Sequence, residues 1–346
     1  MSEKNNLYFP PEWAPQSGVM IAWPDKYTDW ADTLHKVLPV YVEITKQIAR
    51  FEDVLIVCRD AKEVQMRLPD QSLSKIHFLE TDINDTWTRD FGPITVFEDG
   101  KPNIIDFGFN GWGNKYDWHH DNKVTQKLYN SELLAKVGYI NRLNFILEGG
   151  SIETDGQGTL LTTSLCLLSG TRNRNITKAD IEKALGDSLG IKQILWLTKG
   201  HLQGDDTDGH IDTLARFCNE KTIAYVSCKN QHDDHFKELQ AIEGELKGFK
   251  NTDGNSYHLV PLPMVPAIFD EENNRLPATY ANFLIINRAV LVPVYGVDED
   301  KEALEVLQSV FPAREIIPVN CLPLIGQHGS LHCITMQLSR GILKTE

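Results

Sequence analysis

The fold of this 346-residue chain is decided by the stretch DTLHKVLPVYVEITKQIAR (32–50), VLIVC (54–58), KIHFLE (75–80) and GPITVF (92–97). The first of these segments has the apolar spacing of a helix. The three that follow are short and rich in β-branched and aromatic residues, which is typical of strands. This stretch therefore predicts a unit of one helix followed by three strands.

The same order of segments recurs along the chain. Four further helical patterns lie at 122–136, 177–188, 232–247 and 298–310, and the one at 177–188 opens with Thr177 and Asp180, a pair typical of a capping box. The strand-like runs that follow them are LNFIL, SIET and GTLLTT; QILWL, IDTLARF and TIAYVSC; HLVPLPM, NFLIIN and AVLVPVYG; and REIIPVN and LHCITMQL. The last unit is one strand short, and the N-terminal run GVMIAW (18–23) can supply it.

Five α-β-β-β units fit a ring in which each unit buries its strands against its neighbours. The alternative is an ordinary α/β sandwich with irregular insertions. In a ring, loops at one end converge, so residues distant in sequence can meet in one central site.

Composition excludes several classes of function. The formal net charge is -14 and no basic stripe is present, so nucleic acid is not expected as a partner, whereas small cations would be attracted. No stretch approaches the roughly 18 apolar residues of a membrane span, and the N-terminus lacks the apolar core of a signal peptide. The six cysteines form no C-x-x-C pair and indicate no disulfide framework. We expect an intracellular, cytoplasmic protein.

Two segments before strands carry chemically suggestive residues. DTWTRDFGP (85–93) places Trp87, Arg89 and Asp90 before a strand, where the indole can form a wall for a flat cation, although an Arg-Asp pair can equally be structural. In LEGGSIETDGQG (147–158), Glu148 precedes two glycines that allow close backbone approach or unusual dihedral angles. Glu148 could also be a structural partner of the backbone.

A third segment, GDDTDGHIDTLARF (204–217), crowds acidic residues around His210. Such dense negative charge is costly unless a cation lies within it, either a metal or a cationic substrate, or unless the loop is simply solvated. If His210 and Asp212 lie in a strand, their side chains point to the same face.

The fourth segment, GQHGSLHCITMQ (326–337), puts His332 and Cys333 at the start of a β run. A thiol at a strand end can be reactive, and the alternative is a buried strand cysteine. Two stretches rich in ligand-type residues, DWHHD (117–121) and HDDH (232–235), lack the spacing of a zinc motif.

Taken together, these segments resemble the agmatine deiminase family, which includes bacterial peptidylarginine deiminases of the Porphyromonas type. The resemblance covers nearly the whole chain, through PPEWAPQSGVMIAWP, WTRDFGP, LEGGSIETDGQGTLLTT, CLL-x-x-x-RN, DTDGHIDTLARF and HCITMQ. It implies a single domain over 1–346 with the pentein fold, a five-bladed α/β propeller of pseudo-fivefold symmetry. It also implies no metal and no cofactor, and a possible homo-oligomer.

The resemblance also implies roles for individual residues. Cys333 matches the family's nucleophile and His210 its general acid/base, while Asp90 and Asp212 match the carboxylates that grip the guanidinium. Further substrate-pocket positions are matched by Trp87 and Glu148, and Asp208 lies in a matching segment without a firm role.

The implied reaction is hydrolysis of agmatine to N-carbamoylputrescine and ammonia, a step of putrescine biosynthesis, through an amidino-cysteine intermediate. Peptidylarginine or arginine remains open as the substrate, as do an amidinotransferase and a non-catalytic guanidine-binding protein. The family commonly has a Gly-Gly-Gly-Asn-type loop before its His-Cys, whereas this chain has Gln327, His328, Gly329 and Ser330. Because the loop flanks Cys333, this departure bears on substrate identity.

Overall fold

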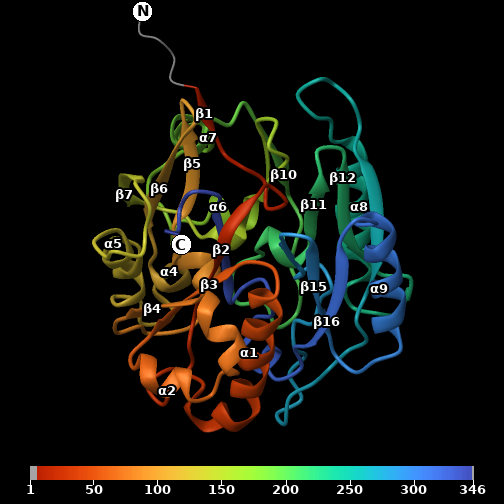
Figure 1. Cartoon of the computed structure of the whole chain (residues 1–346). Helices are drawn as coiled ribbons and strands as arrows, with labels where there is room; N and C mark the ends of the chain where they lie inside the picture. Colours follow the sequence, from red (N-terminus) through yellow and green to blue (C-terminus); the bar gives the residue numbers. More distant parts are fainter. Residues whose placement is uncertain (1–5, 345–346) are drawn as a thin grey trace, which may run out of the picture.

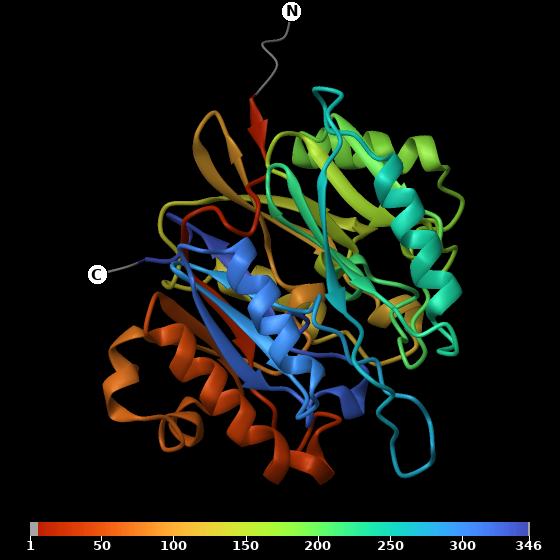
Figure 2. The same cartoon turned by 90° about the vertical axis from the view of Figure 1, so that its right-hand side faces the viewer.

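The computed structural model describes residues 6–344, and the strands in this range form five separate sheets (Figures 1 and 2). All five follow one scheme, in which the first strand is antiparallel to the second and the second is parallel to the third.

In chain order, the sheets contain β5 (Ile94–Glu98), β6 (Lys101–Gly108) and β7 (Gly138–Ile146); β8 (Ile152–Thr154), β9 (Thr159–Thr163) and β10 (Gln193–Leu197); β11 (Ala215–Asn219), β12 (Thr222–Ser227) and β13 (His258–Pro263); β14 (Leu284–Ile286), β15 (Ala289–Val294) and β16 (Glu315–Asn320); and β17 (Thr335–Ser339), β2 (Gln16–Ala22) and β3 (Asp53–Cys58). Two sheets gain an edge strand, β1 (Leu7–Tyr8) on β5 and β4 (Ile76–Glu80) on β3.

A parallel pair of strands needs a crossover connection, and here each crossover carries a helix. These helices are α1 (Leu34–Ala49), α5 (Val124–Tyr129), α7 (Lys178–Leu189), α8 (Phe236–Gly248) and α9 (Glu299–Val310). The four longer ones, α1, α7, α8 and α9, lie on the outside of the sheets (Figures 1 and 2).

Shorter helical segments complete the described elements. They are the α-helices α2 (Ala61–Gln65), α3 (Thr88–Phe91), α4 (Gly111–Asn114) and α6 (Ser164–Leu167), and the 3₁₀ turns η1 (Ala31–Thr33), η2 (Asp70–Lys75), η3 (Asp121–Lys123), η4 (Gly149–Ser151), η5 (Ile211–Thr213) and η6 (Ile325–Gln327).

The predicted count of five units corresponds to the five sheets, but the predicted grouping within a unit is wrong. Each crossover helix lies between the second and third strands of a sheet rather than before all three. A helix is therefore followed by the strand that closes its own sheet, and later strands open the next one. The prediction for the N-terminal run is confirmed, because β2 pairs antiparallel with β17 and joins the two ends of the chain.

One further helix is shorter than predicted, and the predicted start of another helix is confirmed. The helix expected over 122–136 ends at Tyr129, where Asn130 and Ser131 close it with turn hydrogen bonds. The capping box of Thr177 and Asp180 is present at the start of α7. No helix among residues 6–344 is long and apolar enough to cross a membrane.

The core lies where the helices meet the sheets. Residues 19–22 of β2 and 54–57 of β3 are completely buried, as expected for parallel strands covered on both faces. Helix α1 buries Val37, Tyr41, Ile44 and Ile48, whose spacing of three to four residues forms one apolar face.

A short helix or a turn leads into the first strand of every sheet. These segments are the helices α3 before β5, η4 before β8 and η5 before β11, and the turns at residues 280–281 before β14 and 331–334 before β17. Helix α3 packs against η4 and β17, and η4 packs against η5. Segments far apart in the sequence therefore meet at these turns.

Candidate active site

A cavity of about 200 Å³ opens among these turns. Its lining comprises Asp29, Asp85, Trp87, Asp90, Trp112, Tyr116, Asp206, Thr207, Thr213, Gly326, Gln327, His328, Gly329 and Cys333. Of the residues that the sequence analysis singled out, Trp87, Asp90 and Cys333 line this cavity. His210 and Asp212 are not among the lining residues and lie behind them, in contact with Asp90 and Cys333.

Gly150 marks the point where three of the predicted side chains converge. A Cβ atom on this glycine would lie 2.6 Å from His210 Nδ1, 2.8 Å from Asp90 Oδ1 and 3.2 Å from Asp212 Oδ2. The Gly150 amide also donates to Asp90 Oδ1 at 3.0 Å. The pair of glycines after Glu148 thus gives the close backbone approach that the sequence predicted.

Asp90 and Asp212 differ in how fully their carboxylate oxygens are hydrogen-bonded. Trp112 Nε1 donates to Asp90 Oδ2 at 2.9 Å, so both oxygens of Asp90 have partners. Asp212 Oδ2 lies 2.8 Å from His332 Nδ1, whereas Asp212 Oδ1 is buried and has no hydrogen-bond partner among the described residues. A buried acceptor without a donor is costly, and this marks Asp212 Oδ1 as a position for a donor from a ligand.

His210 is held by two carboxylates. Its Nε2 lies 2.9 Å from Glu148 Oε2, and its Nδ1 lies 3.6 Å from Asp90 Oδ1. Glu148 in turn accepts from Arg172 Nε at 3.0 and 3.3 Å. Glu148 therefore orients the imidazole and does not line the cavity.

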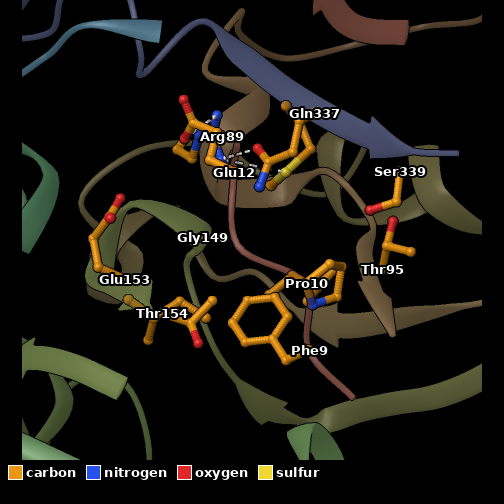
Figure 3. A pocket seen from close by; sticks show the side chains of 13 residues that line it. Phe9, Pro10, Glu12, Arg89, Thr95, Gly149, Glu153, Thr154, Gln337 and Ser339 are labelled. Atoms are coloured by element: carbon orange, nitrogen blue, oxygen red, sulfur yellow. Dashed lines mark hydrogen bonds and ion pairs between the residues drawn. The ribbon is translucent and has the colours of Figure 1, made fainter. Parts of the chain in front are cut away.

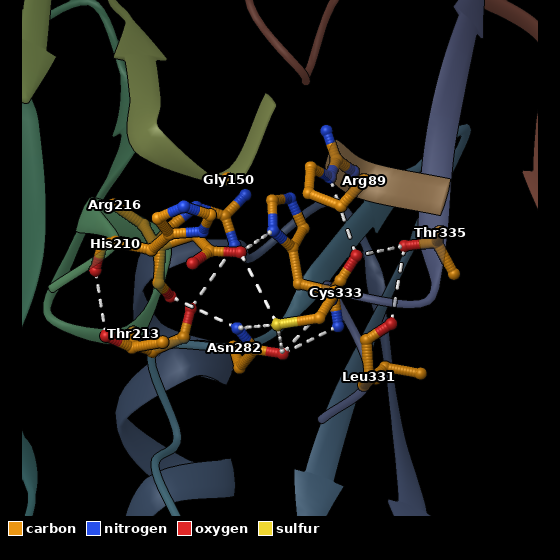
Figure 4. Close-up of polar contacts among 12 residues, drawn as sticks. Arg89, Gly150, His210, Thr213, Arg216, Asn282, Leu331, Cys333 and Thr335 are labelled. Carbon is orange, nitrogen blue, oxygen red and sulfur yellow. Dashed lines mark hydrogen bonds and ion pairs between the residues drawn. The ribbon is translucent and has the colours of Figure 1, made fainter. Parts of the chain in front are cut away.

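Cys333 lies in the turn before β17 and is only 7% exposed, with its sulfur pointing toward Asn282 (Figure 4). The sulfur lies 3.8 Å from Asp212 Oδ2, and 3.4 Å from Asn282 Oδ1 and from Nδ2. Asn282 Oδ1 also accepts from the backbone amides of His332 and Cys333 at 2.8 and 3.3 Å. Asn282 thus fixes the turn that carries the thiol.

The charges of these groups follow from burial and from their neighbours. Burial raises the pKa of Asp90 to about 6, although His210 opposes the shift. Burial alone would raise the pKa of Asp212, but the hydrogen bond and charge of His332 outweigh it, so this pKa is lowered. Asp212 is therefore ionised at neutral pH.

His210 and Cys333 are both shifted upward. Burial alone would lower the pKa of His210, but Asp90, Cys166 and Glu148 raise it well above its usual range. Burial, followed by the charges of Asp212 and Asp90, raises the pKa of the Cys333 thiol well above its usual range. These directions correspond to a protonated imidazole and a neutral thiol at neutral pH.

The loop before Cys333 forms part of the cavity. A side chain on Gly329 would overlap the Trp87 ring, so this glycine lets the indole pack flat against the loop. His328 has a left-handed backbone with φ of 65°, and its Nδ1 lies 2.8 Å from the Gly204 carbonyl oxygen. Gln327 donates to the Asp29 carbonyl oxygen. The predicted departure in this loop therefore lies on the cavity wall.

Three sequence expectations are changed by the structure. His210 and Asp212 lie at the start of η5 and not in a strand, although their side chains still converge near Gly150. Asp208 does not line the cavity, because its carboxylate binds Arg172 and, at 3.0 Å, Lys115. The acidic segment is thus neither a single cation site nor a purely solvated loop.

The other stretches rich in ligand-type residues have structural contacts. His119 stacks on Trp118 at 4.2 Å between ring centroids. His235 Nε2 accepts from the Gln203 amide at 2.7 Å, and its Nδ1 lies 3.1 Å from Asp233 Oδ1.

Sequence reasoning missed Asn282, Trp112 and the partners of Arg172. Asn282 follows the turn before β14, the position in the fourth sheet that corresponds to those of Asp212 and Cys333 in their own sheets. This recurrence was the available signal. Trp112 had none, because its left-handed backbone with φ of 53° places it by an irregular turn.

A thiol, an imidazole and carboxylates gathered from turns that lead into four of the five alike sheets define an α/β protein of the guanidino-group-modifying pentein superfamily. The chain belongs to the Porphyromonas-type peptidyl-arginine deiminase family, whose model matches residues 8–339.

Individual relatives agree with this membership. An agmatine deiminase from Stutzerimonas stutzeri is 32% identical over 360 residues, which cover 96% of either chain. A candidate arginine deiminase from Porphyromonas gingivalis is 50% identical with a TM-score of 0.95, over 98% of this chain and all of that one. A Cys-to-Ser variant of the agmatine deiminase from C. jejuni, solved with substrate bound, is 37% identical with a TM-score of 0.91, over 99% and 98% of the two chains.

Proposed function

We propose that this protein is an agmatine deiminase, which hydrolyses the guanidinium of agmatine to N-carbamoylputrescine and ammonia. The family and the similar agmatine deiminases support the reaction class. The observation that carries the proposal is the buried carboxylate of Asp212, whose Oδ1 has no hydrogen-bond partner among the described residues and whose Oδ2 lies 3.8 Å from the Cys333 sulfur. A guanidinium N–H would supply the donor that Oδ1 lacks.

Asp90 and Asp212 are the proposed grip on the substrate. A guanidinium is a planar cation that cannot lose its proton at neutral pH, and it pairs best with carboxylates through charge-assisted hydrogen bonds. Two carboxylates offset the cost of burying that charge and present its central carbon to the sulfur. Trp87 and Trp112 form apolar walls of the same cavity and would keep the flat group in plane.

The bound cation prepares the nucleophile. Asp212 and Asp90 disfavour a thiolate at Cys333, and a guanidinium between them neutralises this effect. The thiol proton then passes to solvent water, and the thiolate attacks the guanidinium carbon to form a tetrahedral adduct.

His210 moves the protons of the two half-reactions. Its protonated imidazole donates to the amino group that leaves as ammonia, and an amidino group remains bonded to sulfur. The neutral imidazole then takes a proton from water as the water attacks the same carbon. Collapse of this second adduct breaks the C–S bond and releases the ureido product and the thiol. Glu148, fixed by Arg172, holds the ring in place through both steps.

The lining of the cavity favours agmatine over arginine. It includes Asp29, Asp85 and Asp206 together with Tyr116, and none of the described residues lining the cavity is a lysine or an arginine. Agmatine carries a second cation at its far end, whereas arginine carries a carboxylate that would meet these acidic groups. The acidic lining therefore complements a diamine-like substrate.

The arrangement of the sheets is part of the proposal. Five sheets of one scheme, with site residues on the turns before β5, β8, β11 and β17 and Asn282 before β14, support a five-bladed propeller of a single domain over 1–346. Each blade would then contribute one turn to the central site.

A side-by-side assay tests the function. Purified protein is incubated with agmatine, free arginine and an arginine peptide, and ammonia and ureido product are measured for wild type and for Cys333→Ser. We expect agmatine to have the highest kcat/KM and Cys333→Ser to form no product. Reaction of the arginine peptide alone would overturn the proposal that agmatine is the substrate. Absence of ureido product from all three compounds would overturn the deiminase function.

A further inference from the structure

A second histidine stands directly behind the proposed guanidinium grip. His332 is 1% exposed, and its two ring nitrogens face two different carboxylates. Nδ1 lies 2.8 Å from Asp212 Oδ2, and Nε2 lies 2.7 Å from Glu12 Oε2. The family resemblance gave no role to either His332 or Glu12.

This geometry limits which form of the ring satisfies both contacts. An ionised carboxylate can only accept hydrogen bonds, so each of the two contacts needs a proton on the imidazole nitrogen. A neutral imidazole would set a lone pair against one of the carboxylates. Only an imidazolium can donate in both directions at once.

Glu12 is held in place for this contact by groups from other parts of the chain. It lies between β1 and β2, and its Oε2 accepts from Arg216 Nη2 at 2.6 Å while its Oε1 accepts from the Ile285 amide at 2.6 Å. Arg89 Nη2 lies 3.9 Å from the same carboxylate. Figure 3 shows Glu12 and Arg89 side by side, lining a second small cavity.

Glu12 differs from the neighbouring carboxylate of Glu153 in its contact with His332. Arg216 pairs with both carboxylates. Burial alone would raise the pKa of Glu12, but Arg216 and His332 lower it well below its usual range, whereas burial raises the pKa of Glu153. The described hydrogen bonds of Glu153 go to Arg216 and the Phe217 amide, so only a change at Glu12 removes the acceptor that faces His332 Nε2.

We propose that Glu12 is a positioning residue that acts through His332. It keeps His332 as a double donor, which occupies Asp212 Oδ2 and leaves Oδ1 free for the guanidinium. The proposal rests on the proposed function, in which Asp212 binds the substrate. Glu12, more than 300 residues before Cys333 in the sequence, would thus help to shape the substrate site.

The protonation of His332 can be observed without any reaction. In protein labelled with ¹⁵N-histidine, the His332 signals are assigned by their loss in His332→Asn. We expect two protonated ring nitrogens in wild type at neutral pH, and one in Glu12→Gln. A single protonated nitrogen in wild type would overturn the proposal, whether or not the variant folds.

Substrate affinity gives the second readout. Agmatine binding is measured by calorimetry in a Cys333→Ser background, for Glu12→Gln and for the matched control Glu153→Gln. In Glu12→Gln the ring keeps one proton and is no longer held as a donor from both sides, so the hydrogen bond that positions Asp212 is weakened and agmatine binding should weaken about tenfold. The control removes an equally buried carboxylate from the same Arg216 but leaves both hydrogen bonds of His332, so its effect should stay below about threefold.

The outcomes separate the two proposals. Equal weakening by both variants, or none by Glu12→Gln while agmatine still turns over in wild type, would overturn the role of Glu12 and leave the deiminase function standing. Absence of agmatine turnover in wild type would overturn the function, whereas the histidine spectrum would still report the hydrogen bonds of His332. Glu12→Asp keeps the charge and should recover part of the affinity.

Discussion

Gly150→Ala places a methyl group where the proposed catalytic side chains meet. The new Cβ would lie 2.6 Å from His210 Nδ1 and 2.8 Å from Asp90 Oδ1, both shorter than a carbon-to-polar-atom contact allows. Gly150 does not have a positive φ, so alanine fits its backbone conformation. The damage is therefore confined to the side chains of the site.

The size of the effect follows from how firmly those side chains are held. His210 is fixed by Glu148, and Asp90 by Trp112 and the Gly150 amide, so neither can move away without breaking a hydrogen bond. A displacement of about 1 Å at a reacting group costs on the order of a hundredfold in rate. The overpacked methyl group should cost about 1–3 kcal/mol of stability.

The assay is kcat/KM for agmatine together with the free energy of unfolding in urea. Gly170→Ala is the matched control, because a Cβ at Gly170 meets nothing within 4 Å. We expect about a hundredfold loss in Gly150→Ala and unchanged activity in Gly170→Ala. Activity of Gly150→Ala within a few-fold of wild type would refute the convergence of His210 and Asp90 at this point.

Three further predictions concern charge. Burial raises the pKa of Asp90 to about 6, so kcat/KM for agmatine should fall as the pH drops below about 6 and Asp90 loses its charge, and a flat profile to pH 5 would contradict its role. Burial also raises the pKa of Glu52 to about 7, above its ordinary value of 4.5. The contribution of this residue to stability is therefore fully present below about pH 4.5 and is lost as the pH rises through 7. Glu52→Gln should unfold with about 3 kcal/mol more free energy than wild type at pH 8 and show no gain at pH 4 in urea titrations. Arg172→Met removes one of the two cationic groups that hold the buried Glu148 carboxylate, leaving only His210, and should cost about 3–5 kcal/mol, whereas Lys183→Met, which breaks an exposed pair, should cost less than about 1 kcal/mol; equal costs would contradict the burial argument.

The sequence carried the number of repeating units but not their boundaries. Helical and strand spacing are local properties, so the helices near 177–188 and 298–310 could be predicted to within a residue or two. Which strand pairs with which is decided by contacts between distant segments. The grouping of each helix with its following strands therefore failed, while the pairing of β2 with β17 succeeded because one unit lacked a strand.

The residues of the site could be predicted from the sequence, but the distances between them could not. Cys333, His210, Asp90 and Asp212 were proposed from a family resemblance, and the structure brings them together around Gly150 and the cavity. Their spacing alone gave no distance between them. The partners that shape their chemistry, such as Asn282, are single polar residues whose role depends on where the chain folds.

The contact between Glu12 and His332 could not be predicted from the sequence for the same reason. Glu12 and His332 are more than 300 residues apart, and neither belongs to a pattern that indicates a hydrogen bond. Asp208 shows the opposite case, since a residue inside a recognised segment turns out to bind Arg172 at the edge of the site.

The most direct test of the account is rapid acid quenching of the wild-type protein during turnover of agmatine, followed by mass spectrometry of its cysteine peptides. If Cys333 is the nucleophile, the peptide that contains it carries an amidino adduct, and the peptides of the other five cysteines stay unmodified. An adduct on a different cysteine, or normal turnover by Cys333→Ala, would contradict it.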